Sequence, residues 1–369
     1  MNAKALLRRL AFSAVAFANL VGAADAAQDG AARPKSPPAA GVNLSGAEYG
    51  VPNGKAESDF HFPAEEDYAW ARAKGFTFVR LPFLWERIQP ALEKELNADH
   101  LEMLATAVHR ARAHDLSIVL DVHNYGRWRG AAVGTQIAPD QAFADLWRRL
   151  ARKFGGDPHV LFGLMNEPHD MPLAQWATAA QAAIDAIRKT GACNQILVPG
   201  ANWTGAHSWN ADDGAGSNAS LMAKIRDRGP HLFEFHQYLD SDWSGEHAEC
   251  RKPEEVVAAL ANATTWLRAN AAKGFLGEFG APANPQCLAG LDAMLAHMSE
   301  NSDVWAGWAY WAAGAWWPTD YKLSIQPLRG EDRPQMATLA KWIGKTPAPK
   351  GCAAPGSKPV GPKPVKPKR

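Results

Sequence analysis

Residues 160–168 read Val-Leu-Phe-Gly-Leu-Met-Asn-Glu-Pro, an apolar run that closes with Glu167 and a proline. A second run, residues 274–280, reads Gly-Phe-Leu-Gly-Glu-Phe-Gly and carries Glu278 near its end. Both runs are too uniformly apolar for a strand with one face in water, so they predict parallel strands buried on both faces. In a closed parallel barrel, carboxylates at the C-terminal ends of strands lie on the face where chemistry is done.

Six further apolar runs alternate with amphipathic stretches along the chain. The predicted strands are 41–46, 76–83, 117–124, 195–201, 232–238 and 304–312. The predicted helices are 63–74, 98–114, 139–154, 172–190, 253–272 and 286–300. Eight strands with intervening helices predict a single (β/α)8 barrel of the α/β class. A doubly wound open sheet is the alternative, but no glycine-rich phosphate loop follows the first strand.

The two ends of the chain differ in composition from its middle. Residues 1–26 combine a basic start, an apolar stretch and small residues before a cleavage point, which predicts a secretory signal peptide. Residues 27–40 are expected to form a flexible segment, and 41–346 the barrel domain. Residues 347–369 alternate proline with lysine and glycine, which predicts a disordered tail. The mature protein is therefore expected to be secreted, either extracellular or periplasmic.

The four cysteines fit an oxidising compartment, and their spacing matches no zinc motif. Cys250 and Cys287 follow two successive predicted strands, so a bridge between them is expected. Cys193 and Cys352 either pair with each other or stay free.

Charge and composition limit the classes of partner. With 39 basic and 38 acidic residues, the chain offers no electrostatic case for binding nucleic acid. After the signal peptide, no segment is long and apolar enough to cross a membrane. The 15 tryptophans are unusual, because flat indole rings serve both as core bulk and as stacking surfaces for sugars. Nothing in the sequence demands a dimer, so a monomer is expected.

Polar side chains stand at the ends of several predicted strands, where a buried polar group needs either a partner or a task. In addition to the two glutamates they are Arg80, His123, Asn166, His236, Tyr238 and Trp311. Each has a plain structural alternative, such as an ion pair for the arginine or core packing for the tyrosine. Their shared location at strand ends favours a common site.

This set of eight residues, in this order along residues 41–317, resembles the active site of glycoside hydrolase family 5. Residues 41–50, 236–242 and 311–317 are similar to the endoglucanase branch of that family. The resemblance implies that Glu278 is the nucleophile and that Glu167 is the general acid and then the general base. It also implies retention of configuration, with the two carboxyl groups about 5–5.5 Å apart.

The same resemblance implies roles for the companion residues. Arg80 and Tyr238 would hold Glu278 ionised by charge and hydrogen bonding. Asn166 would bond the 2-hydroxyl group of the sugar, a contact that strengthens in the transition state. The two histidines, His123 and His236, would orient substrate hydroxyls and the two acids, and Trp311 would form the floor under the reacting ring.

Aromatic residues in the loops after the strands are weaker candidates for sugar contacts. Trp203 and Trp317 are the two expected to stack on sugars at neighbouring subsites. Among the others, which are Trp128, Trp209, Trp243 and Trp316, some are expected to contact sugar and the rest to pack. Glu48 and Asp242 are further candidates for binding substrate hydroxyls.

No metal site or cofactor is expected. His231, Glu234 and His236 suggest a metal cluster by spacing, but on a strand positions 231 and 234 point to opposite faces. There is neither a nucleophile elbow nor a phosphate-binding loop.

The sequence therefore predicts a secreted endo-β-1,4-glucanase that acts on cellulose-type glucans. The first alternative is the same retaining chemistry on mannan, xyloglucan or mixed-linkage glucan. A second alternative, of another class, is a carbohydrate-binding barrel without catalytic activity. The physiological polysaccharide depends on loop geometry, which the sequence does not reveal.

Overall fold

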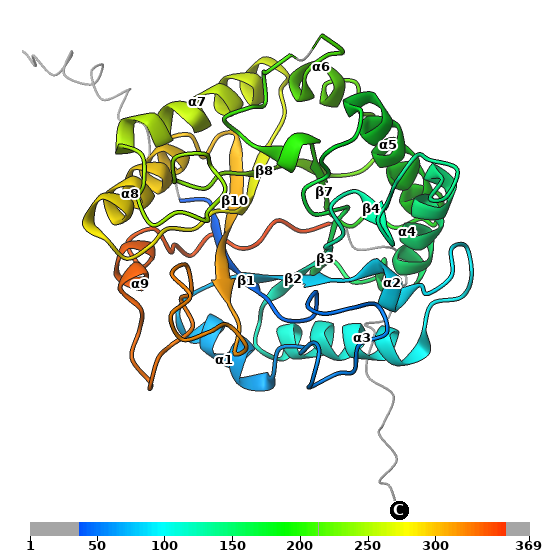
Figure 1. Ribbon diagram of the computed structural model, residues 1–369, viewed down its shortest axis with the longest axis horizontal. Helices are drawn as coiled ribbons and strands as arrows, with labels where there is room; N and C mark the ends of the chain where they lie inside the picture. The colour runs from blue at the N-terminus through cyan, green and yellow to red at the C-terminus, as the bar shows by residue number, and fades with distance from the viewer. Residues whose placement is uncertain (1–36, 213, 352–369) are drawn as a thin grey trace, which may run out of the picture. The chain divides into compact units, whose positions relative to one another are not determined.

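The computed structural model describes residues 37–212 and 214–351, in which eight parallel strands close into a barrel (Figure 1). Around the barrel the order is β1, β2, β3, β6, β7, β8, β9, β10, and β10 pairs with β1. The strands are β1 (Ala39–Leu44), β2 (Phe78–Phe83), β3 (Ser117–Val122), β6 (Val160–Gly163), β7 (Ile196–Pro199), β8 (His231–His236), β9 (Gly274–Glu278) and β10 (Trp305–Ala313). The predicted fold and all eight predicted strands are confirmed.

Helices surround the barrel, and the six predicted ones are all present. They are α1 (Glu65–Ala73), α3 (Ala98–Ala113), α4 (Asp140–Phe154), α5 (Leu173–Lys189), α7 (Pro253–Ala269) and α8 (Pro285–Glu300). Proline opens α7 and α8, where its fixed φ suits the first turn and the missing N–H is not needed. The Asn97 and Asn284 side chains cap α3 and α8 by accepting a backbone N–H bond.

Several short elements were not predicted. They are α2 (Trp85–Ile88), the hairpin β4 (Arg127–Trp128) and β5 (Ala131–Ala132), the 3-10 turn η1 (Asn202–Thr204), α6 (Asn218–Met222) and α9 (Pro334–Leu339). Each is shorter than two helical turns or a normal strand, so hydrophobic periodicity has no room to show. Three of these elements, α2, the hairpin and η1, lie in the loops that follow β2, β3 and β7, and they shape one face of the barrel.

The N-terminal ends of the strands are filled by a layer of apolar side chains inside the barrel. Each strand contributes one residue: Ala39, Phe78, Val119, Leu161, Leu197, Leu232, Phe275 and Ala309. Ala348 joins this layer, and the hydroxyl of Thr346 donates a hydrogen bond to the carbonyl of Pro37. The packed unit therefore extends beyond the predicted domain limits of 41 and 346 at both ends.

The predicted signal peptide (1–26), most of the segment 27–40 and the tail from residue 352 onward lie outside the described residues. A disulfide joins Cys250, in the loop after β8, to Cys287 in the first turn of α8, as predicted. Cys193 is also disulfide-bonded, and Cys352 lies outside the described residues. Within the described part of the chain, every helix is too short or too polar to cross a bilayer.

Candidate active site

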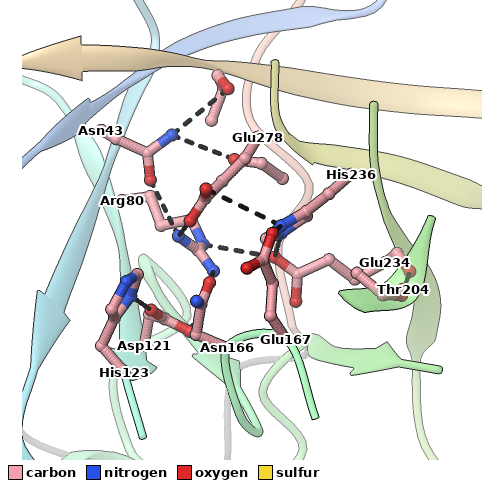
Figure 2. Close-up of polar contacts among 12 residues, drawn as sticks. Asn43, Arg80, Asp121, His123, Asn166, Glu167, Thr204, Glu234, His236 and Glu278 are labelled. Atoms are coloured by element: carbon pink, nitrogen blue, oxygen red, sulfur yellow. Dashed lines mark hydrogen bonds and ion pairs between the residues drawn. The ribbon is translucent and has the colours of Figure 1, made fainter. Parts of the chain in front are cut away.

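Arg80 lies at the centre of a polar cluster inside the barrel (Figure 2). It projects inward from β2 and is fully buried. Its Nη1 donates to Oδ1 of Asn43 at 2.9 Å and to Oε1 of Glu278 at 2.8 Å. Its Nη2 donates to Oδ1 of Asn166 at 2.9 Å. One guanidinium group thus ties together the ends of β1 and β9 and the loop after β6.

Two further carboxylates flank the same guanidinium group. Oδ1 of Asp121 lies 3.1 Å from Nη2 of Arg80, and Oε1 of Glu234 lies 3.2 Å from its Nε. Burial opposes the charge of Arg80, but Asp121, Glu234 and Glu278 together raise its pKa above the ordinary value. Arg80 is therefore a permanent cation, held by three buried anions from three different strands.

Glu278 ends β9 and is 4% exposed. Besides the bond from Arg80, its Oε2 accepts a hydrogen bond from the hydroxyl of Tyr238 at 2.9 Å. Burial raises the pKa of Glu278 above its ordinary value, against the positive charges of His236 and Arg80, which lower it. Arg80 and Tyr238 thus contact the carboxylate as predicted, but desolvation outweighs the nearby positive charges.

Glu167 follows β6 in a loop whose backbone is strained at this residue. Its φ is +42°, a left-handed conformation that is rare outside glycine and that recurs at functional sites. Oε1 of Glu167 lies 2.8 Å from Nδ1 of His236. The preceding residue is fixed as well, since the backbone N–H of Asn166 donates to the carbonyl of Val122 at 2.7 Å. The side-chain oxygen of Asn166 already accepts from Arg80, and its N–H groups are donors that can be offered to a ligand.

The two glutamates meet across the barrel mouth although 111 positions separate them. A carboxylate oxygen of Glu167 and one of Glu278 lie within 4.8 Å of each other, with a ring nitrogen of His236 inside the same distance. The geometry therefore brings the predicted pair together. Inverting glycosidases need a separation of about 6.5–9.5 Å to admit a water molecule between the carboxyl groups.

Three carboxyl groups surround His236 and favour the charged form of its ring. Burial alone would lower its pKa, but the negative charges of Glu278, Glu167 and Glu234 raise the pKa of His236 to about 10. Two carboxyl groups and an imidazole therefore lie together in one group, which can hold and transfer protons.

His123 has a similar environment on the opposite side of Arg80. Burial again opposes the charge, but Nδ1 of His123 lies 2.8 Å from Oδ2 of Asp121, and this contact, together with Glu278, raises the pKa of His123. The ring stacks on Trp311 at a centroid distance of 5.6 Å and an interplanar angle of 15°. Trp311 is held in turn by a bond from its Nε1 to the hydroxyl of Tyr321 at 3.1 Å.

A cleft crosses the barrel face above these residues. One part, of about 1060 Å³, contains both glutamates, and a second part, of about 520 Å³, continues past His123 and Tyr125. Trp311 and Trp317 line both parts. The site residues thus lie along a groove that is longer than one sugar unit would need.

Trp203 reaches this cleft through an unusual turn. Residues 202–204 all have φ between 51° and 55°, so η1 is left-handed, and the Trp203 side chain is 48% exposed. Its ring stacks on His169 at 4.5 Å with an interplanar angle of 8°. Trp317 stacks on Tyr321 at 3.9 Å. Both predicted loop aromatics therefore line the cleft.

The weaker candidates divide into cleft residues and core residues. Glu48 is in the second part of the cleft, and Asp242 and Trp243 are in the first. Trp209 is fully buried against Phe235, so it packs in the core and is out of reach of a ligand. Trp316 stacks on His61 and Trp128 lies partly buried, and neither lines the cleft.

Three buried members of the cluster were missed as site residues: Asn43, Asp121 and Glu234. Asn43 donates from Nδ2 to the carbonyl of Gly277 at 3.0 Å and accepts from Arg80, so it links β1 to β9. Asp121 and Glu234 each precede a site histidine by two positions, Glu234 within β8 and Asp121 near the end of β3, which stops one residue before His123. That repeated spacing, with side chains on one strand face, is the signal in the sequence that could have found them.

Comparison with known proteins gives a consistent result. Residues 39–314 match the sequence profile of the family Cellulase (glycosyl hydrolase family 5). An endoglucanase of Neurospora crassa is 39% identical over 294 residues, 79% of this chain and 73% of that protein. The endo-β-1,4-glucanase Xac0029 of Xanthomonas axonopodis pv. citri has 48% identity and a TM-score of 0.82, over 83% of this chain and 98% of that one. XacCel5A, solved in complex with cellopentaose, has 47% identity and a TM-score of 0.82, over 83% of this chain and 99% of that one.

Proposed function

Because this chain belongs to glycosyl hydrolase family 5, the family of the cellulases, we propose that it cleaves internal β-1,4-glucosidic bonds of cellulose-type glucans with retention of configuration. As a member of that family it is a glycoside hydrolase of the endo-β-1,4-glucanase type. The observation that supports the proposed mechanism is the approach of a carboxylate oxygen of Glu167 to one of Glu278 within 4.8 Å, which is shorter than the roughly 6.5–9.5 Å between the carboxyl groups of inverting enzymes.

In the first step, a carboxylate oxygen of Glu278 attacks the anomeric carbon while the bond from that carbon to the leaving oxygen breaks. The carboxyl group of Glu167 gives its proton to the leaving oxygen, so one part of the glucan departs as an alcohol. The products of this step are a glycosyl ester on Glu278 and an ionised Glu167. The hydrogen bond between Glu167 and His236 keeps the acid aimed at the bond that breaks.

In the second step, Glu167 acts as a base. It takes a proton from a water molecule as the water oxygen attacks the anomeric carbon, and the ester bond to Glu278 breaks with release of its carboxylate. Two inversions at the same carbon give net retention. The carboxylates supply both the nucleophile and the proton, so the chemistry needs neither metal nor cofactor.

The other residues of the site would bind the sugar units of the substrate. The free N–H groups of Asn166 would bond the sugar 2-hydroxyl, since its oxygen is held by Arg80. Trp311, lying flat against His123, would form the floor under the reacting sugar. Trp203 and Trp317 would stack on sugars at neighbouring positions along the cleft.

The substrate class rests on the family and on the length of the aromatic-lined cleft. Activity on carboxymethyl cellulose should exceed that on galactomannan or xyloglucan, and hydrolysis of cellopentaose should first give the β-anomer. Proton NMR during the first minutes measures the anomer before mutarotation. Faster hydrolysis of galactomannan would change the substrate assignment alone, whereas the α-anomer as first product would contradict the mechanism.

The pH profile is expected to be bell-shaped, with an acidic limb that lies above the ordinary range of a glutamate. Glu278 must be ionised to attack, and its pKa is raised by burial, so kcat/KM should fall as the pH drops through a value above 4.5. The alkaline limb would report the general acid, which must carry a proton for the first step. Initial rates on a soluble cello-oligosaccharide across the pH range measure both limbs, and an acidic midpoint below 4.5 would contradict this environment for Glu278.

We also propose that the enzyme is exported as a monomer after removal of residues 1–26. The Cys250–Cys287 bridge supports maturation in an oxidising compartment. Intact mass of the secreted protein would identify the cleavage point.

A further inference from the structure

Glu234 is a buried carboxylate that neither part of the cleft includes. It lies on β8, two positions before His236, so both side chains project from the same face of the strand. Its Oε1 is 3.2 Å from Nε of Arg80 and 3.6 Å from Nε2 of His236. Its side chain is fully buried. Glu234 therefore contacts two residues of the site while lining neither part of the cleft (Figure 2).

The neighbouring strand leaves space for this carboxylate. Gly277 on β9 faces Glu234, and a Cβ added at Gly277 would lie 2.1 Å from Oε1 of Glu234. The residue directly before Glu278 is therefore without a side chain where the Glu234 carboxylate lies. If Glu234 only balanced the charge of Arg80, contact with Arg80 would suffice, but its position also places it against the far nitrogen of His236.

The contact between Glu234 and His236 matters for the charge balance of the buried cluster. Apart from Glu167, the buried cluster holds Arg80, two histidines whose pKa values are raised by neighbouring acids, and three acidic side chains, which are Asp121, Glu234 and Glu278. Asp121 contacts His123 and Glu234 contacts His236, so each ring has its own carboxylate. When Glu278 becomes an ester, the cluster loses one negative charge, and His236 then faces only Glu167 and Glu234.

We propose that Glu234 is a positioning residue, whose carboxylate beside Nε2 keeps His236 in the doubly protonated form, so that Nδ1–H stays bonded to Glu167 through both steps. The inference rests on the proposed roles of Glu278 and Glu167. The charged groups that face His236 are Glu167 from the loop after β6, Glu278 from β9 and Glu234 on its own strand. Of these, only Glu234 has no part in bond making.

The test is Glu234→Gln in the full chain, with the ring nitrogens of His236 followed by ¹⁵N NMR as the pH is raised. Wild-type His236 should remain an imidazolium through neutral pH, because its pKa is raised to about 10. In the variant its deprotonation should move down by about 1–3 pH units, the usual effect of losing one nearby opposite charge. A His236→Asn variant assigns the signal.

Kinetics supply a second readout. E234Q should lower kcat by about 10- to 100-fold, the range found when the carboxylate behind a metal-bound histidine is removed. KM for cellopentaose should stay near the wild-type value, because Glu234 does not line the cleft. The matched control is Asp157→Asn, which removes a buried carboxylate paired with Arg112 before β6. It should lower the melting temperature while leaving the His236 titration and kcat unchanged.

Identical His236 titrations in E234Q and wild type would overturn the proposal, as would a titration moved equally by D157N. If E234Q does not fold, Glu234→Asp withdraws the charge by one methylene group and should give a smaller shift in the same direction. The NMR result does not depend on turnover, so it would stand even if Glu278 were shown not to be the nucleophile. A failure of the proposed role of Glu234 can therefore be told apart from a failure of the proposed catalytic function.

Discussion

Replacing Glu278 with glutamine is expected to lower kcat on carboxymethyl cellulose by on the order of 10⁵-fold or more, the scale of losing a covalent nucleophile. The amide keeps the shape of the side chain and can still accept hydrogen bonds from Arg80 and Tyr238 through its oxygen. It cannot form the ester with the anomeric carbon. Initial rates of reducing-sugar release measure the loss.

Binding separates this effect from a damaged cleft. Calorimetric titration should show that E278Q still binds cellopentaose, because the stacking surfaces around Trp311 and Trp203 are untouched. The D157N variant again controls for loss of a buried carboxylate, and it should hydrolyse at the wild-type rate. An E278Q variant with wild-type turnover would remove Glu278 from the mechanism.

Replacing Glu167 with alanine is expected to lower kcat on the polysaccharide by about 10²- to 10⁴-fold, the contribution of general acid–base catalysis. The loss should depend on the leaving group. A dinitrophenyl cellobioside needs no proton on its leaving oxygen, so its first step should remain fast and the glycosyl-enzyme should accumulate. The second step should then be slow, because no base activates water.

Azide provides the diagnostic for E167A. A small anion that needs no deprotonation can enter the space left by the side chain and attack the ester, which should restore turnover and yield a β-glycosyl azide. Product NMR measures its configuration. Equal rate losses on the polysaccharide and the activated substrate, with no azide product, would show that Glu167 is not the acid–base residue.

The sequence predicted the barrel and the meeting of Glu167 with Glu278 because both depend on regular features. Parallel strands that are buried on both faces are recognisable in the sequence as apolar runs, and the closed sheet brings their C-terminal ends together. Once the strands are assigned, residues at their ends converge without further information. That is why Arg80, His236 and Trp311 were predicted together with the two acids.

The layer beneath the site was harder to predict. Asp121 and Glu234 each lie two positions before a more conspicuous histidine, and their cationic partner Arg80 comes from another strand. An acidic residue in an apolar run can be interpreted either as a buried ion-pair partner or as the exposed end of a strand, and the choice depends on knowing which cation faces it. The left-handed turn at 202–204 was missed for another reason, because it contains no glycine to signal positive φ.

The raised pKa of Glu278 could not be predicted from the sequence either. The sequence identified Arg80 and Tyr238 as its contacts, and both contact it in the structure. Sequence alone gives no measure of how much water the barrel removes from a carboxylate, and here desolvation is the larger effect.

The most direct test of the account is to trap the proposed ester. Incubation with a 2-fluorocellobioside that carries a good leaving group should inactivate the enzyme and add one fluorocellobiosyl group, located by peptide mass mapping on Glu278. A label on that residue would identify the nucleophile and show that a β-glucosyl unit is accepted there. A label on any other side chain, or no covalent label during turnover, would contradict double displacement at Glu278.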